Sequence, residues 1–392
     1  MTARLPHNPR VLAAPGNAAL HAEVAALGGQ PPCGEWFVKL DRLPAEQAEA
    51  LRRTAEEHAG ALVRPPASGP AQAILRVPAE RLGACLDALA PRSLADAVRA
   101  TIDAWRRERF TLGCGGQALE LGRRTLVMGI VNVTPDSFSD GGAFLDPAAA
   151  IEHGRRLAEE GADILDIGGE STRPGAQAVD AETECQRVLP VVQALARELD
   201  LPISIDTSKA SVAARALGAG ASMLNDVTAL RGDPQMADLA ARSGAPLVLM
   251  HMQGTPRSMQ EAPHYDDLMG EILAYLRQGM AMALDAGVGE EQVAVDPGIG
   301  FGKTVGHNLE ILRRLAELRS LGCPILLGTS RKSVIGAVLG LPLERRLLGT
   351  AATVAYGIAR GAHVVRVHDV AAMRQVARMS DAMVGREWAE GE

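Results

Sequence analysis

The chain is poor in the residues that build disulfide frameworks and simple metal sites. It has five cysteines, at positions 33, 85, 114, 185 and 323, and no two of them have C-x-x-C spacing. This spacing argues against a zinc site and against a disulfide framework, and it is typical of reduced, mostly buried thiols.

Aromatic residues, positive charge and long apolar runs are also scarce. Aromatic content is 3% and the net charge is −7, so the chain offers neither stacking platforms nor a general attraction for nucleic acid. No apolar run approaches the roughly 18 residues that a spanning helix needs, and the first ten residues lack the apolar core of a signal peptide. We therefore expect a cytoplasmic protein with no membrane and no nucleic-acid partner.

By contrast, the chain contains eight short apolar runs, each of which ends on a polar residue or a glycine. They cover residues 126–131, 163–168, 202–206, 222–226, 246–251, 292–296, 324–328 and 363–368. Helical patterns lie between them, at 147–160, 182–199, 209–217, 234–241, 308–320 and 371–383. Alternation of strand and helix implies right-handed crossovers and a parallel sheet, and eight units favour an α/β (β/α)₈ TIM barrel over an open doubly wound sheet.

In such a barrel every strand ends at one face, where chemistry is usually mounted. This predicts that one cavity collects the strand-end residues Asn132, Asp206, Asn225, Asp226, His251, Asp296, Arg366 and His368. After the first strand, Asn132, Thr134, Asp136 and Ser137 begin a polar loop that ends at Gly141 and Gly142; a plain solvated connection is the alternative reading of this loop.

The first 110 residues form a different pattern. Strands are expected at 35–40 and 71–77, and helices at 44–57 and 78–89, which predicts a small α+β domain over 1–110, ahead of a barrel over 118–392. An amphipathic helix at 93–107 could dock on the barrel, and 112–116 is expected to be a hinge. We favour a structural appendage over a role in regulation or oligomer contacts.

The segment DPGIGFGKT, residues 296–304, resembles a phosphate-binding loop but matches neither known pattern. A Walker motif needs a glycine where Pro297 stands, and the third glycine comes one residue early for a dinucleotide fingerprint. What remains is a strand-end carboxylate followed by a compact glycine turn that brings backbone close to a ligand and presents Phe301 as a wall.

The polar strand ends divide by charge. Asp206, Asn225 and Asp296 suit the adjacent N–H and NH₂ donors of an aminopyrimidinone ring. The alternative is that Asp206 caps the helix after its strand and that Asn225 and Asp226 cap the next, but Asp296 precedes a glycine turn rather than a helix. Residues 330–333 (SRKS) and 366–369 (RVHD) suit an anion, with a structural pair between Arg366 and Asp369 as the alternative. The loop at 170–175 is expected to order over the substrate.

At these residues the chain resembles the dihydropteroate synthase family, from about residue 122 to residue 384. The motifs that carry the resemblance are MGIVNVTPDSFSDGG, GGESTRPGA, SIDTSK, NDV, MHMQGTP, DPGIGFGKT, GTSRKS and VRVHDV, in the family's order. The resemblance implies that 7,8-dihydropterin-6-ylmethyl diphosphate and 4-aminobenzoate are joined with loss of pyrophosphate. It does not extend to the first 110 residues.

The resemblance also implies a role for each matching residue. The pterin would be held by Asp206, Asn225, Asp296 and Lys332; the diphosphate by Asn132, Arg366 and His368, with Asn132 acting through Mg²⁺; the aminobenzoate by Thr172, Arg173, Pro174, Phe301 and Ser330. The loop 135–142 would close over the site. Asp206, Asp296, Lys332, Arg366 and His368 would carry catalysis, in a chain expected to be a homodimer.

The matching motifs contain no Ser-His-Asp or Cys-His constellation. This agrees with a dissociative displacement, which needs positioning and charge stabilisation rather than a protein nucleophile. Two rivals stay open: a pterin-dependent methyltransferase, which would not need the cations at 330–333 and 366–368, and a pterin-binding protein without catalysis.

Overall fold

The computed structural model describes residues 2–12, 34–63, 72–134, 147–171, 176–255 and 258–387. These residues divide into two compact units. The N-terminal unit comprises Met1–Glu108, Asp267–Gln278 and Arg313–Gly322, and the barrel unit comprises Arg109–Asp266, Gly279–Leu312 and Cys323–Glu392. Two late segments of the chain therefore belong to the N-terminal unit.

The N-terminal unit is an antiparallel sheet with helices. The strands run in the order β1-β2-β4-β3, and their bounds are β1 Arg10–Val11, β2 Glu35–Leu40, β3 Ala61–Val63 and β4 Ala73–Pro78. The helices are α2 Ala45–Glu57, α3 Leu82–Ala88 and α4 Arg92–Arg106. The expected strands and helices of this region are confirmed, and α4 packs on the 3₁₀ helix η3 (Leu315–Leu321).

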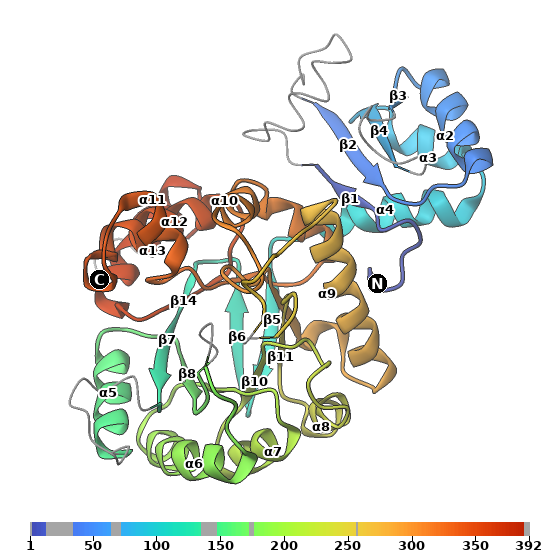
Figure 1. The fold of residues 1–392 in the computed structure, drawn as a ribbon. Helices are drawn as coiled ribbons and strands as arrows, with labels where there is room; N and C mark the ends of the chain where they lie inside the picture. Colours follow the sequence, from blue (N-terminus) through green and yellow to red (C-terminus); the bar gives the residue numbers. More distant parts are fainter. Residues whose placement is uncertain are drawn as a thin grey trace. The chain divides into compact units, whose positions relative to one another are not determined.

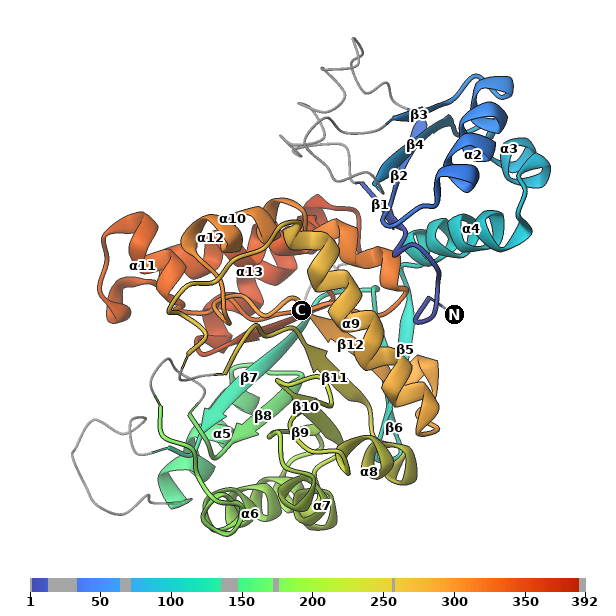
Figure 2. The ribbon, with the colours of Figure 1, turned by 45° about the vertical axis from the view of Figure 1, so that its right-hand side comes forward.

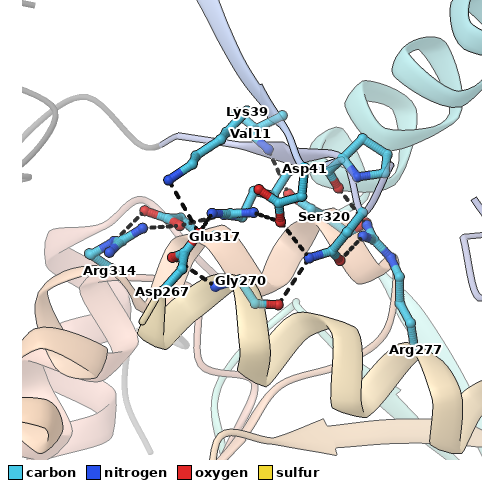
Figure 3. Close-up of polar contacts among 12 residues, drawn as sticks. Val11, Lys39, Asp41, Asp267, Gly270, Arg277, Arg314, Glu317 and Ser320 are labelled. Atoms are coloured by element: carbon cyan, nitrogen blue, oxygen red, sulfur yellow. Dashed lines mark hydrogen bonds and ion pairs between the residues drawn. The ribbon is translucent and has the colours of Figure 1, made fainter. Parts of the chain in front are cut away.

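A buried charge cluster joins the first residues of this unit to its late segments (Figure 3). Arg10 is fully buried and pairs with Asp41 at 2.7 Å, with Asp267, and with Glu317 at 3.7 Å. Arg314 binds Glu317 at 2.8 Å. Removing one partner from such a buried cluster leaves an uncompensated charge, so the cluster makes residues 2–12 an integral part of the unit.

A second arginine of the unit binds a side chain and a backbone carbonyl of the same segment. Arg277 donates to Asn8 Oδ1 and to the Pro9 carbonyl, both at 2.6 Å, and Val11 N donates to Ser320 Oγ at 2.9 Å. Burial, together with the charge of Arg10, lowers the pKa of Arg277 to about 9.

The barrel unit contains eight parallel strands, in the order β12-β11-β10-β9-β8-β7-β14-β13. A parallel bridge between Val295 and Ile325 joins the two ends of this order. The bounds are β7 Leu126–Asn132, β8 Ile164–Gly168, β9 Ile203–Asp206, β10 Met223–Asp226, β11 Leu247–Met250, β12 Val293–Asp296, β13 Leu326–Leu327 and β14 Val364–Val367. The predicted (β/α)₈ barrel is confirmed; Figure 2 shows β7 to β11 side by side.

Helices surround these strands (Figure 1). They are α5 Pro147–Glu159, α6 Ala181–Glu198, α7 Ala210–Ala219, α8 Met236–Ser243, α9 Leu268–Asp285, α10 Val305–Arg313, α11 Ser333–Leu339, α12 Leu347–Ala359 and α13 Val370–Met383, with 3₁₀ turns η2 Glu290–Gln292 and η4 Leu343–Arg345. Helix α9 begins in the N-terminal unit and continues into the barrel unit. The single helix predicted at 308–320 is wrong, because the chain leaves helical geometry at Arg314 and separates α10 from η3.

The segment 112–116, predicted as a hinge, is part of a β-hairpin. Strands β5 (Phe110–Cys114) and β6 (Gln117–Leu121) pair in antiparallel fashion, and Gly115 and Gly116 form the turn with φ of 56° and 94°. Phe110, Leu112 and Leu121 join the hydrophobic cluster formed by the first residues of the barrel strands. The hinge prediction is wrong because these glycines serve a tight turn.

Two predictions from composition can be compared with the described residues. Cys85, Cys114, Cys185 and Cys323 are buried and form no disulfide, as expected, whereas Cys33 lies outside the described residues. Over the same described ranges, no helix is both long and apolar enough to cross a membrane.

Candidate active site

The strand register sets four strand-end positions in one row. Asn132 pairs with Gly168, Gly168 with Asp206, and Asp206 with Asn225. A Cβ on Gly168 would contact Asp206 Cβ at 3.4 Å, so this position brings the chain close to the carboxylate. Asp296 ends β12 and pairs with Met250 of β11, the strand next to β10. The structure thus gathers the predicted strand-end residues on one face of the barrel.

Arg366 is held between two carboxylates within this face. Its Nε donates to Asp166 Oδ2 at 2.5 Å and its Nη2 donates to Asp206 Oδ2 at 2.7 Å. Asn225 Nδ2 donates to the same Asp166 oxygen at 3.2 Å. The alternative pair between Arg366 and Asp369 is wrong, and so is helix capping by Asp206, since α7 has no side-chain cap.

Asp166 is a site residue that sequence reasoning missed. It lies in the middle of β8, is fully buried, and contacts Arg366 from β14. Its position inside an apolar run was interpreted only as strand. A lone carboxylate in a strand buried on both faces was the available signal, because burial of a charge requires a partner.

Opposing effects act on the pKa of Asp206. Burial raises the pKa of this carboxyl to about 7 against the attraction of Arg366, and the negative charges of Asp166, Glu184 and Asp226 raise it further. Arg366 keeps a raised pKa despite its burial, because Asp166 and Asp206 stabilise its charge. Arg366 therefore favours the ionised form of Asp206, against burial and the neighbouring carboxylates.

Asp296 and Lys332 form the other half of the face. Asp296 accepts a hydrogen bond from Gly298 N at 2.6 Å, and burial raises the pKa of its carboxyl. Lys332 precedes α11; its Nζ donates to the Ile299 carbonyl and lies 4.6 Å from the centre of the Phe301 ring. Burial lowers the pKa of Lys332 to about 8, while Asp296 opposes the shift.

The predicted anion-binding segments meet at the ends of β13 and β14. His368 Nδ1 lies 2.9 Å from Ser330 Oγ, and His368 N donates to the same oxygen at 3.2 Å. Arg331 has a left-handed backbone with φ of 57° and pairs with Asp369 through its Nε at 2.9 Å. This pair holds the turn that carries Ser330 and Lys332.

Two further strand-end residues organise loops. Asp226 accepts hydrogen bonds from Thr228 N at 2.8 Å and Leu230 N at 2.7 Å, within the turn after β10. The capping alternative is wrong for this residue, since α8 begins at Met236 and has no side-chain cap. His251 is buried, and its Nδ1 lies 2.9 Å from Lys303 Nζ. Burial lowers the pKa of both His251 and Lys303.

Some predicted residues lie outside the described residues. They are the loop 135–142, with Asp136 and Ser137, and the residues Thr172, Arg173 and Pro174.

A protein-only metal cage is not seen in the part of the chain that the structure describes, where no three His, Cys, Asp or Glu side chains come together suitably. Asn132 offers a hard amide oxygen at the end of β7, half-buried at the rim. Mg²⁺ accepts one or two protein oxygens when substrate phosphates supply the rest, so this donor fits a phosphate-bridged ion.

Known proteins resemble the barrel unit closely. A family model described as pterin binding enzyme matches residues 128–368. A dihydropteroate synthase of Synechocystis is 49% identical over 68% of this chain and 93% of its own, and that of Bacillus subtilis is 48% identical over 69% and 92%.

Solved structures of dihydropteroate synthases also resemble this chain. A Xanthomonas albilineans dihydropteroate synthase with 4-aminobenzoic acid is 47% identical, with a TM-score of 0.66, and covers 70% of this chain and 98% of that one. A Yersinia pestis dihydropteroate synthase with a sulfonamide drug is 42% identical, with a TM-score of 0.67, over 71% and 100%. With these matches and this strand-end face, the chain belongs to the dihydropteroate synthase family of pterin-binding enzymes.

Proposed function

We propose that the barrel condenses 7,8-dihydropterin-6-ylmethyl diphosphate with 4-aminobenzoate to give 7,8-dihydropteroate and pyrophosphate. The observation that carries this proposal is the gathering of buried Asp296 with half-buried Asp206, Arg366 and Lys332 on one barrel face, where acceptors for a pterin adjoin cations for a diphosphate. The Xanthomonas albilineans relatives with 4-aminobenzoic acid and with 7,8-dihydropteroate support both ends of the reaction.

The pterin would lie against Asp206, Asn225, Asp296 and Lys332. A carboxylate matches adjacent N–H and NH₂ donors in bidentate fashion, and a buried one gains more from them because its other partners are few. Asp296 already has one oxygen bound to Gly298 N, which orients the carboxylate. Lys332 supplies a donor for a ring carbonyl or nitrogen and offsets the charge of Asp296.

The diphosphate would lie against Asn132, Arg366 and His368. Arg366 uses Nε and Nη2 for Asp166 and Asp206, which leaves Nη1 to bind an anion. Mg²⁺ would be held by the Asn132 amide oxygen and the diphosphate, where it would neutralise negative charge on the leaving group. Helix α13, whose first residue follows Asp369, adds the positive end of its dipole on the same side.

The aminobenzoate would lie against Phe301 and Ser330, with Thr172, Arg173 and Pro174 completing its site. Phe301 supports this through its position at the tip of the glycine turn, next to Lys332. Ser330 is anchored by His368 and so connects this site to the diphosphate side.

Departure of pyrophosphate leaves positive charge on the pterin methylene, which the field of Asp206 and Asp296 stabilises. The amine of aminobenzoate is a weak nucleophile, so its placement beside this electrophile supplies much of the rate enhancement. No protein nucleophile is required.

A homodimer is proposed as the working form. Large apolar side chains are exposed on consecutive elements of the barrel unit: Val338 and Leu339 on α11, Leu343 on η4, and Leu347 and Leu348 on α12. Exposed apolar clusters of this kind mark protein interfaces. Sedimentation should show a dimer, and Leu348→Glu should shift it to monomer.

Pyrophosphate release from the dihydropterin diphosphate, with and without 4-aminobenzoate, tests the function. Release that requires aminobenzoate supports a synthase, methyl transfer from a methylated pterin would identify the rival enzyme, and pterin binding without turnover would identify a binding protein. Asp206→Asn and Asp296→Asn should each lower kcat/KM at least a hundredfold in folded protein, as for loss of a preorganised charge. Near-normal turnover in either variant would refute the assignment.

A further inference from the structure

The glycine turn after β12 lies directly against the backbone of the loop after β11. Gly298 and Gly302 have φ of 67° and 65°. A Cβ on Gly298 would lie 1.9 Å from the His251 carbonyl oxygen, and one on Gly302 would lie 2.4 Å from that of Gln253. Only glycine fits these two positions, so the turn and the loop form one packed layer.

Four consecutive carbonyl groups of this turn accept hydrogen bonds from side chains. Ile299 O accepts from Lys332; the other three acceptor and donor pairs are Gly300 O with Gln260 Nε2 at 2.6 Å, Phe301 O with Lys303 Nζ at 2.9 Å, and Gly302 O with Tyr265 OH at 2.8 Å. Carbonyl groups in a surface turn are ordinarily hydrated, and their fixation by side chains orients each peptide plane. The backbone on both sides of Phe301 is thereby held.

Lys303 is the inner anchor of this arrangement. It is 3% exposed, and its Nζ reaches Phe301 O, His251 Nδ1 at 2.9 Å and His251 O at 3.4 Å. His251 N in turn donates to Asp296 O at 3.0 Å. Lys303 thus connects the wall residue Phe301 with the strand end that carries Asp296.

Tyr265 is the outer anchor. Its hydroxyl binds Gly302 O, and its ring packs edge to face on His307 at 5.1 Å. The ring stays packed when only the hydroxyl is removed, so the hydrogen bond can be deleted with little change elsewhere.

We propose that Lys303 and Tyr265 are positioning residues that set the affinity for aminobenzoate by holding Phe301 in place. Neither side chain touches substrate; each acts through the turn. This inference rests on the proposed function, because it takes Phe301 as one wall of the aminobenzoate site.

Steady-state kinetics of Tyr265→Phe and Lys303→Met, with each substrate varied in turn, test the proposal. Loss of one hydrogen bond to the turn should raise KM for 4-aminobenzoate about fivefold in Tyr265→Phe, and loss of the buried amine should raise it about tenfold or more in Lys303→Met. In Tyr265→Phe, KM for the dihydropterin diphosphate should stay within about twofold; Lys303→Met also removes a group that acts on Asp296, so the comparison of the two KM values is made in Tyr265→Phe. The matched control is Tyr356→Phe on α12, which removes a hydroxyl that accepts a hydrogen bond from Arg360, the residue after this helix, and should leave both KM values unchanged.

The split between the two KM values separates positioning from stability. A merely structural role would lower the melting temperature and the active fraction with both KM values unchanged, and this result would overturn the proposal. A parallel rise of both KM values in Tyr265→Phe would overturn it as well. If Lys303→Met does not fold, the outcome for Tyr265→Phe decides. Absence of synthase activity in the parent protein would instead refute the proposed function.

Discussion

Replacement of Asp166 by asparagine should move the pH dependence of the enzyme without removing its activity. Asp166 is fully buried, shares Arg366 with Asp206, and is one of the negative charges that raise the pKa of Asp206 to about 7. Asparagine keeps an oxygen acceptor for Arg366, and its amide nitrogen would replace Asp166 Oδ1, which has no hydrogen-bond partner among the described residues. The variant therefore removes charge more than shape.

The direction of the shift follows from the two neighbours of Asp206. Loss of the Asp166 charge removes a repulsion and leaves Arg366 to attract Asp206 alone, so the pKa of Asp206 falls. Neighbouring charges shift a carboxyl pKa by about 1–3 units, and each unit corresponds to about 1.4 kcal/mol. If Asp206 accepts pterin hydrogen bonds in its ionised form, kcat/KM rises with pH through the pKa of the free enzyme. The acid limb should then move to lower pH by about one unit or more.

The assay is the pH profile of kcat/KM for the dihydropterin diphosphate, from pyrophosphate release. A one-unit shift from a pKa of about 7 would increase activity at about pH 6, relative to the plateau, about fivefold. The control is Asp163→Asn, since Asp163 precedes the same strand at its other end and binds Arg124 and Val127 N. An unmoved acid limb, or one moved to higher pH, would refute the reasoning.

Further predictions concern the N-terminal unit and the metal. In urea unfolding monitored by tryptophan fluorescence, Arg10→Met should lower the free energy of unfolding of this unit by about 3–5 kcal/mol, whereas Arg52→Met, at an exposed ion pair, should leave it nearly unchanged. The charges of Arg10 and Lys39 outweigh burial and hold the pKa of Asp267 below its ordinary value, so this carboxylate stabilises the unit above the unfolded pKa of about 4 and that stability should be lost in acid denaturation as pH falls through the folded pKa. A chain beginning at Arg109 should keep synthase activity with reduced thermal stability, while one beginning at Ala118 should aggregate in light-scattering measurements because it lacks β5. EDTA should abolish pyrophosphate release, and added Mg²⁺ should restore it.

The barrel could be predicted because each strand is a short apolar run that ends on a polar residue, and a parallel strand buried on both faces leaves that pattern. The hairpin at 110–121 could not, since two adjacent glycines serve a hinge and a tight turn equally well. The separation of α10 from η3 was equally hidden. No proline or glycine marks it, and Arg314 and Glu317 enter a charge cluster whose other members lie at positions 10, 41 and 267.

The sequence predicted which strand ends contribute residues to the candidate site, but not which of these residues pair with one another. Asp206, Asn225 and Asp296 were placed at strand ends by position, whereas Arg366 was assigned to an anion, with Asp369 as the alternative partner, and pairs with Asp166 and Asp206. Barrel closure brings β14 next to β7, and this pairing of distant segments is not visible in local sequence. The side chains that bind the carbonyl groups of the glycine turn were missed too. Tyr265 and Gln260 lie in a loop that carries no strand-end signal.

The shared guanidinium links the two halves of the proposed reaction. In the resting site Arg366 is neutralised by Asp166 and Asp206, so it presents less net positive charge to a diphosphate than an isolated arginine would. When the pterin occupies Asp206, its N–H and NH₂ donors share the negative charge of that carboxylate, and the guanidinium has more of its charge to offer the diphosphate through Nη1. Binding of the pterin and stabilisation of the leaving group would then reinforce each other. Because such coupling is reciprocal, pyrophosphate should tighten the binding of a pterin lacking the diphosphate by the same factor as the pterin tightens pyrophosphate. Calorimetric titration of each ligand in the presence of the other measures this factor, and Asp206→Asn should reduce it; equal affinities with and without the second ligand would show that Arg366 does not connect the two subsites.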